Sequence, residues 1–126
     1  MKITVLDLAQ SEAAFRKLLE QDGISPRFAF TLGQMARIIN VDLQEYEKAR
    51  VIAFKQVGEV DPQTNQYKVE GADGLQKLGD LLEPLYQKEI ELDISTISIK
   101  TLEEEKVNLT GADMSTLWWL IRDSEG

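Results

Sequence analysis

Three acidic side chains in the second half of the chain are the first candidates for chemistry. Glu89, Glu91 and Asp93 alternate with aliphatic residues, which is the period of a strand with one polar face. Carboxylates spaced in this way come within about 7 Å of one another, and hard cations such as Mg²⁺ or Ca²⁺ prefer such oxygen ligands. The plainer interpretation, which the sequence favours, is that these three residues, the acidic face, line the solvent side of an amphipathic strand.

The side chains needed for most nucleophilic and zinc chemistry are absent. The chain contains no cysteine and no histidine, which excludes disulfides, thiol catalysis, Cys/His zinc sites and Ser-His pairs. The stretch 71–74 holds two glycines but lacks the lysine and the strand-to-helix context of a phosphate-binding loop. We therefore expect no enzyme activity, no cofactor and no bound metal. A metal-dependent enzyme built on the acidic face is the alternative.

The charge distribution limits the classes of partner. The chain holds 22 acidic and 14 basic residues, a net charge of −8. Residues 1–69 are balanced, so residues 70–126 carry the whole excess. The basic residues between 27 and 55 are interleaved with acidic ones, which indicates a salt-bridged surface rather than a basic strip. We expect no binding to nucleic acid or to an anionic membrane, whereas a basic protein partner is permitted.

Neither a membrane span nor a signal peptide is predicted. No apolar run approaches the roughly 18 residues that span a bilayer, and the first residues carry no signal-peptide pattern. We expect a soluble protein in the cytoplasm.

Two adjacent tryptophans, Trp118 and Trp119, are candidates for a contact with another chain, because tryptophan is enriched in interaction hot spots. Neighbouring positions on a helix point about 100° apart. We expect Trp118 to join Met114, Leu117 and Ile121 in the core and Trp119 to face a partner.

A long helix over residues 26–57 is the clearest structural signal. Ser25 is a helix-capping residue and Pro26 suits the first helical position. Apolar residues follow at alternating spacings of four and three, the pattern of a helix with one buried face, and Gly58 ends it. Gly33 inside this helix costs about 1 kcal/mol relative to alanine, so we expect a close backbone neighbour there.

Shorter elements flank the long helix. We predict a strand at 2–6, a helix from Asp7 to the stop at 22–23, a third helix capped by Asp73, strands at 89–94 and 97–99, a solvated turn at 103–105 and a final helix capped by Thr110. The segments 3–8 and 97–102 share a short pattern, and we expect them to be neighbours in one sheet. The polar segment 58–70 fits either a hairpin or a loop.

These elements predict an α+β fold in one domain, residues 1–126. Residues 26–88 form a long antiparallel helical hairpin, the arm. Residues 1–25 and 89–126 form a base of two or three short strands and two short terminal helices. The third helix is too short to cover the first part of the long helix, so we expect the base to cover it.

An arm of two helices leaves apolar side chains that self-association would cover. We list the candidate interaction residues as Tyr46, Ala49, Ala53, Phe54, Val57 and Trp119. We expect a homo-oligomer joined through the arm, and a monomer with one narrow apolar stripe is the alternative.

The motif YEKAR at 46–50 lies in the middle of the long helix, and the motif EIELDI at 89–94 forms the acidic strand. In these motifs and in the order of its elements the chain resembles small, uncharacterised bacteriophage-encoded proteins with a long-helix hairpin and terminal strands. The resemblance implies an accessory or assembly protein in a bacterial host cytoplasm, without catalytic residues to carry over.

The sequence thus favours a non-enzymatic protein-interaction or assembly module that acts as an oligomer through its helical arm. The alternative is an acidic inhibitor or regulator that binds a basic site on a host protein through residues 70–105.

Overall fold

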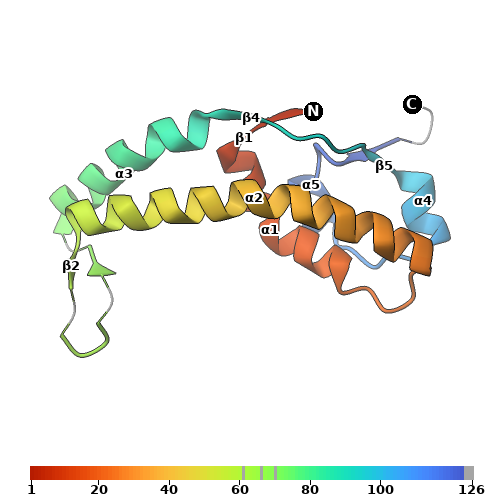
Figure 1. The fold of residues 1–126 in the computed structure, drawn as a ribbon, viewed down its shortest axis with the longest axis horizontal. Coiled ribbons are helices and arrows are strands. Elements are labelled where there is room, and N and C mark those ends of the chain that lie inside the picture. Colours follow the sequence, from red (N-terminus) through yellow and green to blue (C-terminus); the bar gives the residue numbers. More distant parts are fainter. Residues whose placement is uncertain (61, 66, 70, 124–126) are drawn as a thin grey trace.

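One long helix organises the molecule. The computed structural model describes residues 1–60, 62–65, 67–69 and 71–123. Helix α2 (Pro26–Val57) is unbroken over 32 residues and runs along the length of the molecule (Figure 1). Within the described ranges the fold is α+β, as predicted, with five helices and short strands that form three two-stranded sheets.

The start of α2 is fixed by its cap and by a second element. The Ser25 hydroxyl accepts a hydrogen bond from the Phe28 N–H at 3.2 Å, and Pro26 occupies the first helical position. The Glu105 carboxylate accepts hydrogen bonds from the Ser25 N–H at 2.6 Å and from the Ser25 hydroxyl at 2.8 Å. This carboxylate satisfies donors at the start of the helix and ties α2 to the C-terminal part of the chain.

The end of α2 requires glycine. A Cβ atom on Gly58 would lie 2.9 Å from the carbonyl oxygens of Lys68 and Phe54. Strands β2 (Glu59–Val60) and β3 (Tyr67–Lys68) follow as an antiparallel pair. Of the two predicted alternatives for 58–70, a hairpin and a loop, the described part of this segment is therefore a hairpin. Residues 61, 66 and 70 lie outside the described part.

Helix α3 (Gly71–Gln87) returns along only the C-terminal part of α2 (Figure 1). Ala53, Leu78 and Leu82 are buried between the two helices, and partly buried side chains of both helices surround them. The predicted antiparallel arm is therefore present in part, with a small hydrophobic cluster of its own.

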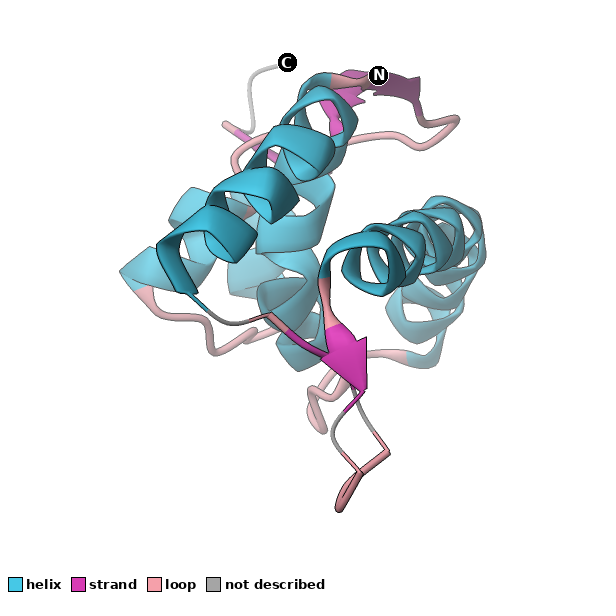
Figure 2. Ribbon diagram, turned by 90° about the vertical axis from the view of Figure 1, so that its left-hand side faces the viewer, coloured by secondary structure: helices cyan, strands magenta, loops and turns pink. Residues whose placement is uncertain are grey.

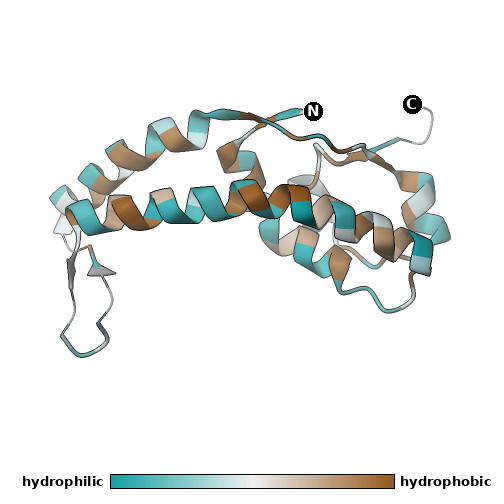
Figure 3. Cartoon of the chain, viewed as in Figure 1, coloured by the Kyte–Doolittle hydropathy of each residue, from teal (hydrophilic) through white to brown (hydrophobic). Residues whose placement is uncertain are grey.

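The two ends of the chain form the base. Its elements are β1 (Lys2–Thr4), α1 (Val5–Leu19), β4 (Glu89–Glu91), β5 (Ile97–Ser98), α4 (Ile99–Glu104), α5 (Gly111–Thr116) and β6 (Ile121–Arg122). The main core joins side chains of these elements to Phe28, Leu32, Met35 and Ile39 of α2. Hydrophobic residues recur along the whole of α2 (Figure 3), and the base covers those of its first part, as predicted.

The predicted pairing of segments 3–8 and 97–102 is wrong. β1 pairs antiparallel with β4, with Ile3 opposite Ile90, and β5 pairs parallel with β6. The shared pattern has another cause: Thr4 caps α1 and Ser98 caps α4 through their side-chain oxygens. Both segments are short strands that turn into a capped helix, so their similarity indicates a local transition and not a shared sheet.

Other corrections concern helix limits. α1 begins at Val5, two residues before the expected start at Asp7, because Thr4 and Asp7 form a capping box. Likewise α3 begins at Gly71, ahead of the expected cap at Asp73. In the stretch 103–105, expected as a solvated turn, Glu103 and Glu104 end α4 and Glu105 is its C-cap. The close neighbour expected at Gly33 is wrong, because a Cβ atom there would meet nothing within 4 Å.

Candidate interaction surface

The outer face of α2 is the largest candidate site. Phe28, Leu32, Met35, Ile39 and Ala53 are the buried residues of this helix. Apolar side chains on the opposite side are exposed: 69% of Phe30, 62% of Val41, 56% of Ile52 and 38% of Val51. We define the outer face of α2 by these four exposed residues.

The position of α2 leaves this face open. In Figure 1 the helix crosses in front of α1, and in Figure 2 it lies at the right-hand edge with α3 and the base on one side of it. A helix with apolar side chains on both faces, of which only one is packed, presents a surface that protein partners commonly cover.

A shallow groove runs along the C-terminal half of this face. Its lining includes Val51 and Ile52, with Gln44, Glu47, Lys48 and Lys55 around them. The alkyl chains of the two lysines extend the apolar surface, while their ammonium groups reach solvent. Such a groove suits the apolar side chains of another protein.

Ion pairs within α2 neutralise much of the charge beside the groove. The Lys48 Nζ atom lies 3.6 Å from the Glu45 Oε1 atom, and the Arg50 Nη2 atom lies 2.6 Å from the Glu47 Oε1 atom. The hydrogen bond from Arg50 lowers the pKa of Glu47, and the pKa of Arg50 is raised in return. Both changes favour the charged forms, so this surface keeps paired charges rather than a group poised for proton transfer.

The structure turns most of the predicted interaction residues toward α3. Ala53 is buried, and Phe54 and Val57 pack around it from α2. The Tyr46 ring lies 6.2 Å from that of Tyr86. Ala49 is half-buried. An intermolecular role for these residues would require α3 to move away, so we place the candidate surface on the opposite side of α2.

The assignment of the two tryptophans is reversed. Trp119 is only 4% exposed and belongs to the main core, whereas Trp118 is 60% exposed. The predicted helix would have continued to Ile121, but α5 ends at Thr116, so the 100° spacing does not apply beyond it. The indole N–H of Trp119 is buried and has no hydrogen-bond partner among the described residues.

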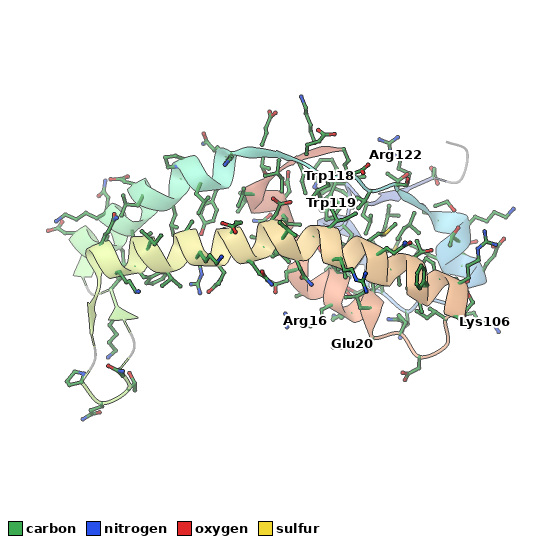
Figure 4. All side chains as sticks on the ribbon, in the orientation of Figure 1. Arg16, Glu20, Lys106, Trp118, Trp119 and Arg122 are labelled. Atoms are coloured by element: carbon green, nitrogen blue, oxygen red, sulfur yellow. The ribbon has the colours of Figure 1, made fainter. Side chains whose placement is uncertain are left out.

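Trp118 forms a smaller exposed feature in the base. It lines a depression with Trp119, Arg122 and the first three residues, and Figure 4 places the labelled Trp118, Trp119 and Arg122 close together. The depression mixes one exposed aromatic ring with basic side chains, which makes it a secondary candidate for contact.

The acidic face is exposed, as predicted. Glu89, Glu91 and Asp93 are all exposed, while Ile90 and Leu92 between them point inward. Glu91 accepts a hydrogen bond from the N-terminal ammonium at 2.8 Å, which lowers the pKa of this carboxyl. Within the described ranges no group of three or more acidic residues lies together in a way that could hold a metal ion.

A cavity of about 270 Å³ lies between α1 and α2. Its lining is largely apolar and includes Leu8, Phe15 and Trp119. Glu12 and Arg16 also line it and form an exposed ion pair with each other at 2.9 Å. The charged groups of this cavity are therefore already paired with each other.

The sequence pattern missed all four residues of the outer face, which are Phe30, Val41, Val51 and Ile52. A helix that packs against one partner normally carries polar residues on its other side. Apolar residues on the side opposite the main apolar stripe were therefore the signal that could have identified them.

Comparison of the chain with models of protein families, with curated proteins and with solved structures gives no match. Across the described part of the chain no helix combines the length and the apolar character needed to cross a membrane.

Proposed function

We propose that the protein is a non-enzymatic protein-interaction or assembly module in which the base holds α2 in place and the outer face of α2 binds another protein chain. The supporting observation is the set of exposed apolar side chains on a helix whose other face packs against the base at one end and against α3 at the other. Exposing Val41 and Ile52 to water has a free-energy cost that binding would recover.

The mechanism follows from the rigidity of the helix. The ends of α2 are held by the Ser25–Glu105 hydrogen bonds and by the turn at Gly58. Because the backbone is ordered before binding, a partner would order only side chains on this surface, which lowers the entropy cost of association. The bacteriophage accessory role and the cytoplasmic location stay predictions from the sequence.

A pair of matched variants tests the proposal. Ile52→Glu introduces a charge into the outer face, whereas Leu75→Glu introduces one at a similarly exposed position, 59% accessible, on α3. We expect the first variant to abolish binding and the second to retain it, because only the first places a charge where apolar contact is needed. Light scattering measures self-association, and affinity capture from a bacterial lysate measures binding to other proteins.

Circular dichroism is the control: because both positions are exposed, both variants should keep the helix content of the wild type. Loss of binding in both variants, or in neither, would place the interaction elsewhere. A wild-type protein that stays monomeric at high micromolar concentration and captures no protein through the outer face would reject the proposal.

A further inference from the structure

We propose that the chain covering the outer face of α2 is a second copy of this protein, with the two α2 helices packed antiparallel about a two-fold axis. This inference rests on the proposed function and adds the identity of the partner and the arrangement of the helices.

The basis is a stripe of residues with the spacing of a helix-pairing seam. Starting at residue 38, the intervals are three, four, three, four and three, which keeps the side chains on one line along the helix. All of them are exposed except the first, which is partly buried. We call this stripe the outer seam; it consists of Ile38, Val41, Glu45, Lys48, Ile52 and Lys55.

The outer seam is complementary to itself when reversed. Glu45 and Lys48 form an ion pair at 3.6 Å within each copy. With the two-fold axis midway between these two residues, Glu45 of one copy also faces Lys48 of the second copy, so the four charges alternate in sign. Val41 of one copy then faces Ile52 of the second copy. Val41 and Ile52 thus meet on either side of two acid–base pairs, as a two-fold interface requires, while Ile38 at each end of the seam lies opposite Lys55 of the second copy.

Two other arrangements of the outer seam place like charges together. A parallel pair would set each Glu45 against Glu45 and each Lys48 against Lys48. An antiparallel pair centred on Lys48 would bring the two Lys48 ammonium groups together and place Val41 opposite Lys55. Like charges facing each other oppose association, so the charge pattern selects the first arrangement.

The shape of the molecule leaves room for the second helix. α2 stands in front of α1 in Figure 1 and at the edge of the molecule in Figure 2. The outer seam is about 26 Å long at about 1.5 Å per residue. A contact of this length with two apolar layers is small compared with stable interfaces, so we expect a dimer of micromolar rather than nanomolar affinity.

Charge reversal tests the register. Lys48→Glu sets acidic side chains opposite each other, and Glu45→Lys sets basic ones opposite each other. We expect each single variant to weaken the dimer about tenfold in sedimentation equilibrium, because every dimer holds two copies of the pair. The double variant Glu45→Lys/Lys48→Glu restores the complementarity and should recover an affinity close to that of the wild type.

Distances between spin labels test the direction of the helices. The chain has no cysteine, so a single introduced cysteine is labelled uniquely. In the proposed dimer two labels on Gln44→Cys lie about 8 Å apart along the axis and two labels on Gln56→Cys about 29 Å apart. A parallel dimer would give the same short separation at both positions.

The outcomes separate this inference from the proposed function. A tenfold loss in both single variants, its recovery in the double variant and unequal label separations support the antiparallel dimer. A dimer sensitive to Ile52→Glu but not to charge reversal overturns the register, and equal short separations overturn the direction. A wild-type monomer that still captures another protein through the outer face overturns the second copy but keeps the proposed function.

Discussion

At the scale of single residues, the contact between Tyr46 and Tyr86 makes the free energy of unfolding depend on the protonation of a phenol. The two rings lie 6.2 Å apart with an interplanar angle of 37°. Burial, followed by the hydrogen bond to Tyr86, raises the pKa of Tyr46 from 10.0 to about 12. The folded protein therefore holds this proton to a higher pH than the unfolded chain, so the contribution of Tyr46 to stability is complete below pH 10 and is lost as the pH rises toward 12.

This predicts a specific alkaline loss of stability. The free energy of unfolding of the wild type, measured by urea titration, should fall between pH 10 and 12. In Tyr46→Phe the fall should be smaller, because the variant has no phenol proton to hold at this position. An equally steep fall in the variant would show that other groups cause it.

The residues of the candidate surface show the limits of sequence reasoning. Val41 and Ile52 were not predicted, because periodicity identifies the more apolar face of a helix and gives no rule for apolar residues on the other. The predicted positions of Trp118 and Trp119 in the core and at the surface were reversed, because α5 ends at Thr116 without the glycine or proline that usually marks a helix end. The acidic face was predicted correctly, since strict alternation fixes which side of an extended segment is polar.

At the scale of elements, prediction succeeded where a segment carries its own signals. The cap at Ser25, the proline after it and a long apolar period specified α2 independently of the rest of the chain. The strands of two or three residues carry no such signal, because their pairing depends on partners distant in sequence, as in the parallel contact of Ile97 with Ile121. Their order was therefore out of reach.

Substitutions of two glycines test the backbone of α2 and of the turn that follows it: Gly33 lies inside the helix and Gly58 is its C-cap. We expect Gly33→Ala to stabilise the protein by up to about 1 kcal/mol, since alanine favours the helix and the added methyl group meets no neighbour within 4 Å. Thermal unfolding followed by circular dichroism measures the change. A lower melting temperature would mean that an unrecognised contact occupies this site.

Gly58→Ala provides the contrast. Its Cβ atom would lie 2.9 Å from two carbonyl oxygens, so the turn from α2 into β2 must distort. We expect a lower melting temperature for this variant, although both changes add the same methyl group. Equal effects of the two substitutions would contradict the structure of the turn.

At the scale of the whole molecule, the described residues form two hydrophobic clusters of unequal size. Among them, the cluster in the arm has three buried residues, whereas that in the base has fifteen. Because local stability follows the amount of buried apolar surface, the arm should open more often than the base. We expect faster amide hydrogen exchange in α3 than in α1, measured by mass spectrometry.

Two substitutions sharpen this prediction. Leu82→Ala removes apolar contacts only in the arm cluster and should accelerate exchange in α3 and in the C-terminal part of α2. Leu18→Ala opens a cavity in the base, where the side chain is fully buried, and should lower global stability by about 2–5 kcal/mol. If Leu82→Ala accelerated exchange throughout the base to the same extent, the two clusters would unfold as one cooperative unit, contrary to this prediction.

The adjacent tryptophans also give the molecule a pair of built-in optical reporters. Trp119, enclosed by the core, should emit fluorescence at shorter wavelength and resist quenching by iodide, whereas the solvated Trp118 should emit at longer wavelength and be quenched readily. Trp118→Phe would leave the emission of the buried Trp119, which reports unfolding of the base, and Trp119→Phe would leave that of Trp118, which responds to contact at the surface as well as to unfolding. Comparison of the two variants would then distinguish loss of the fold from contact at the depression that Trp118 lines.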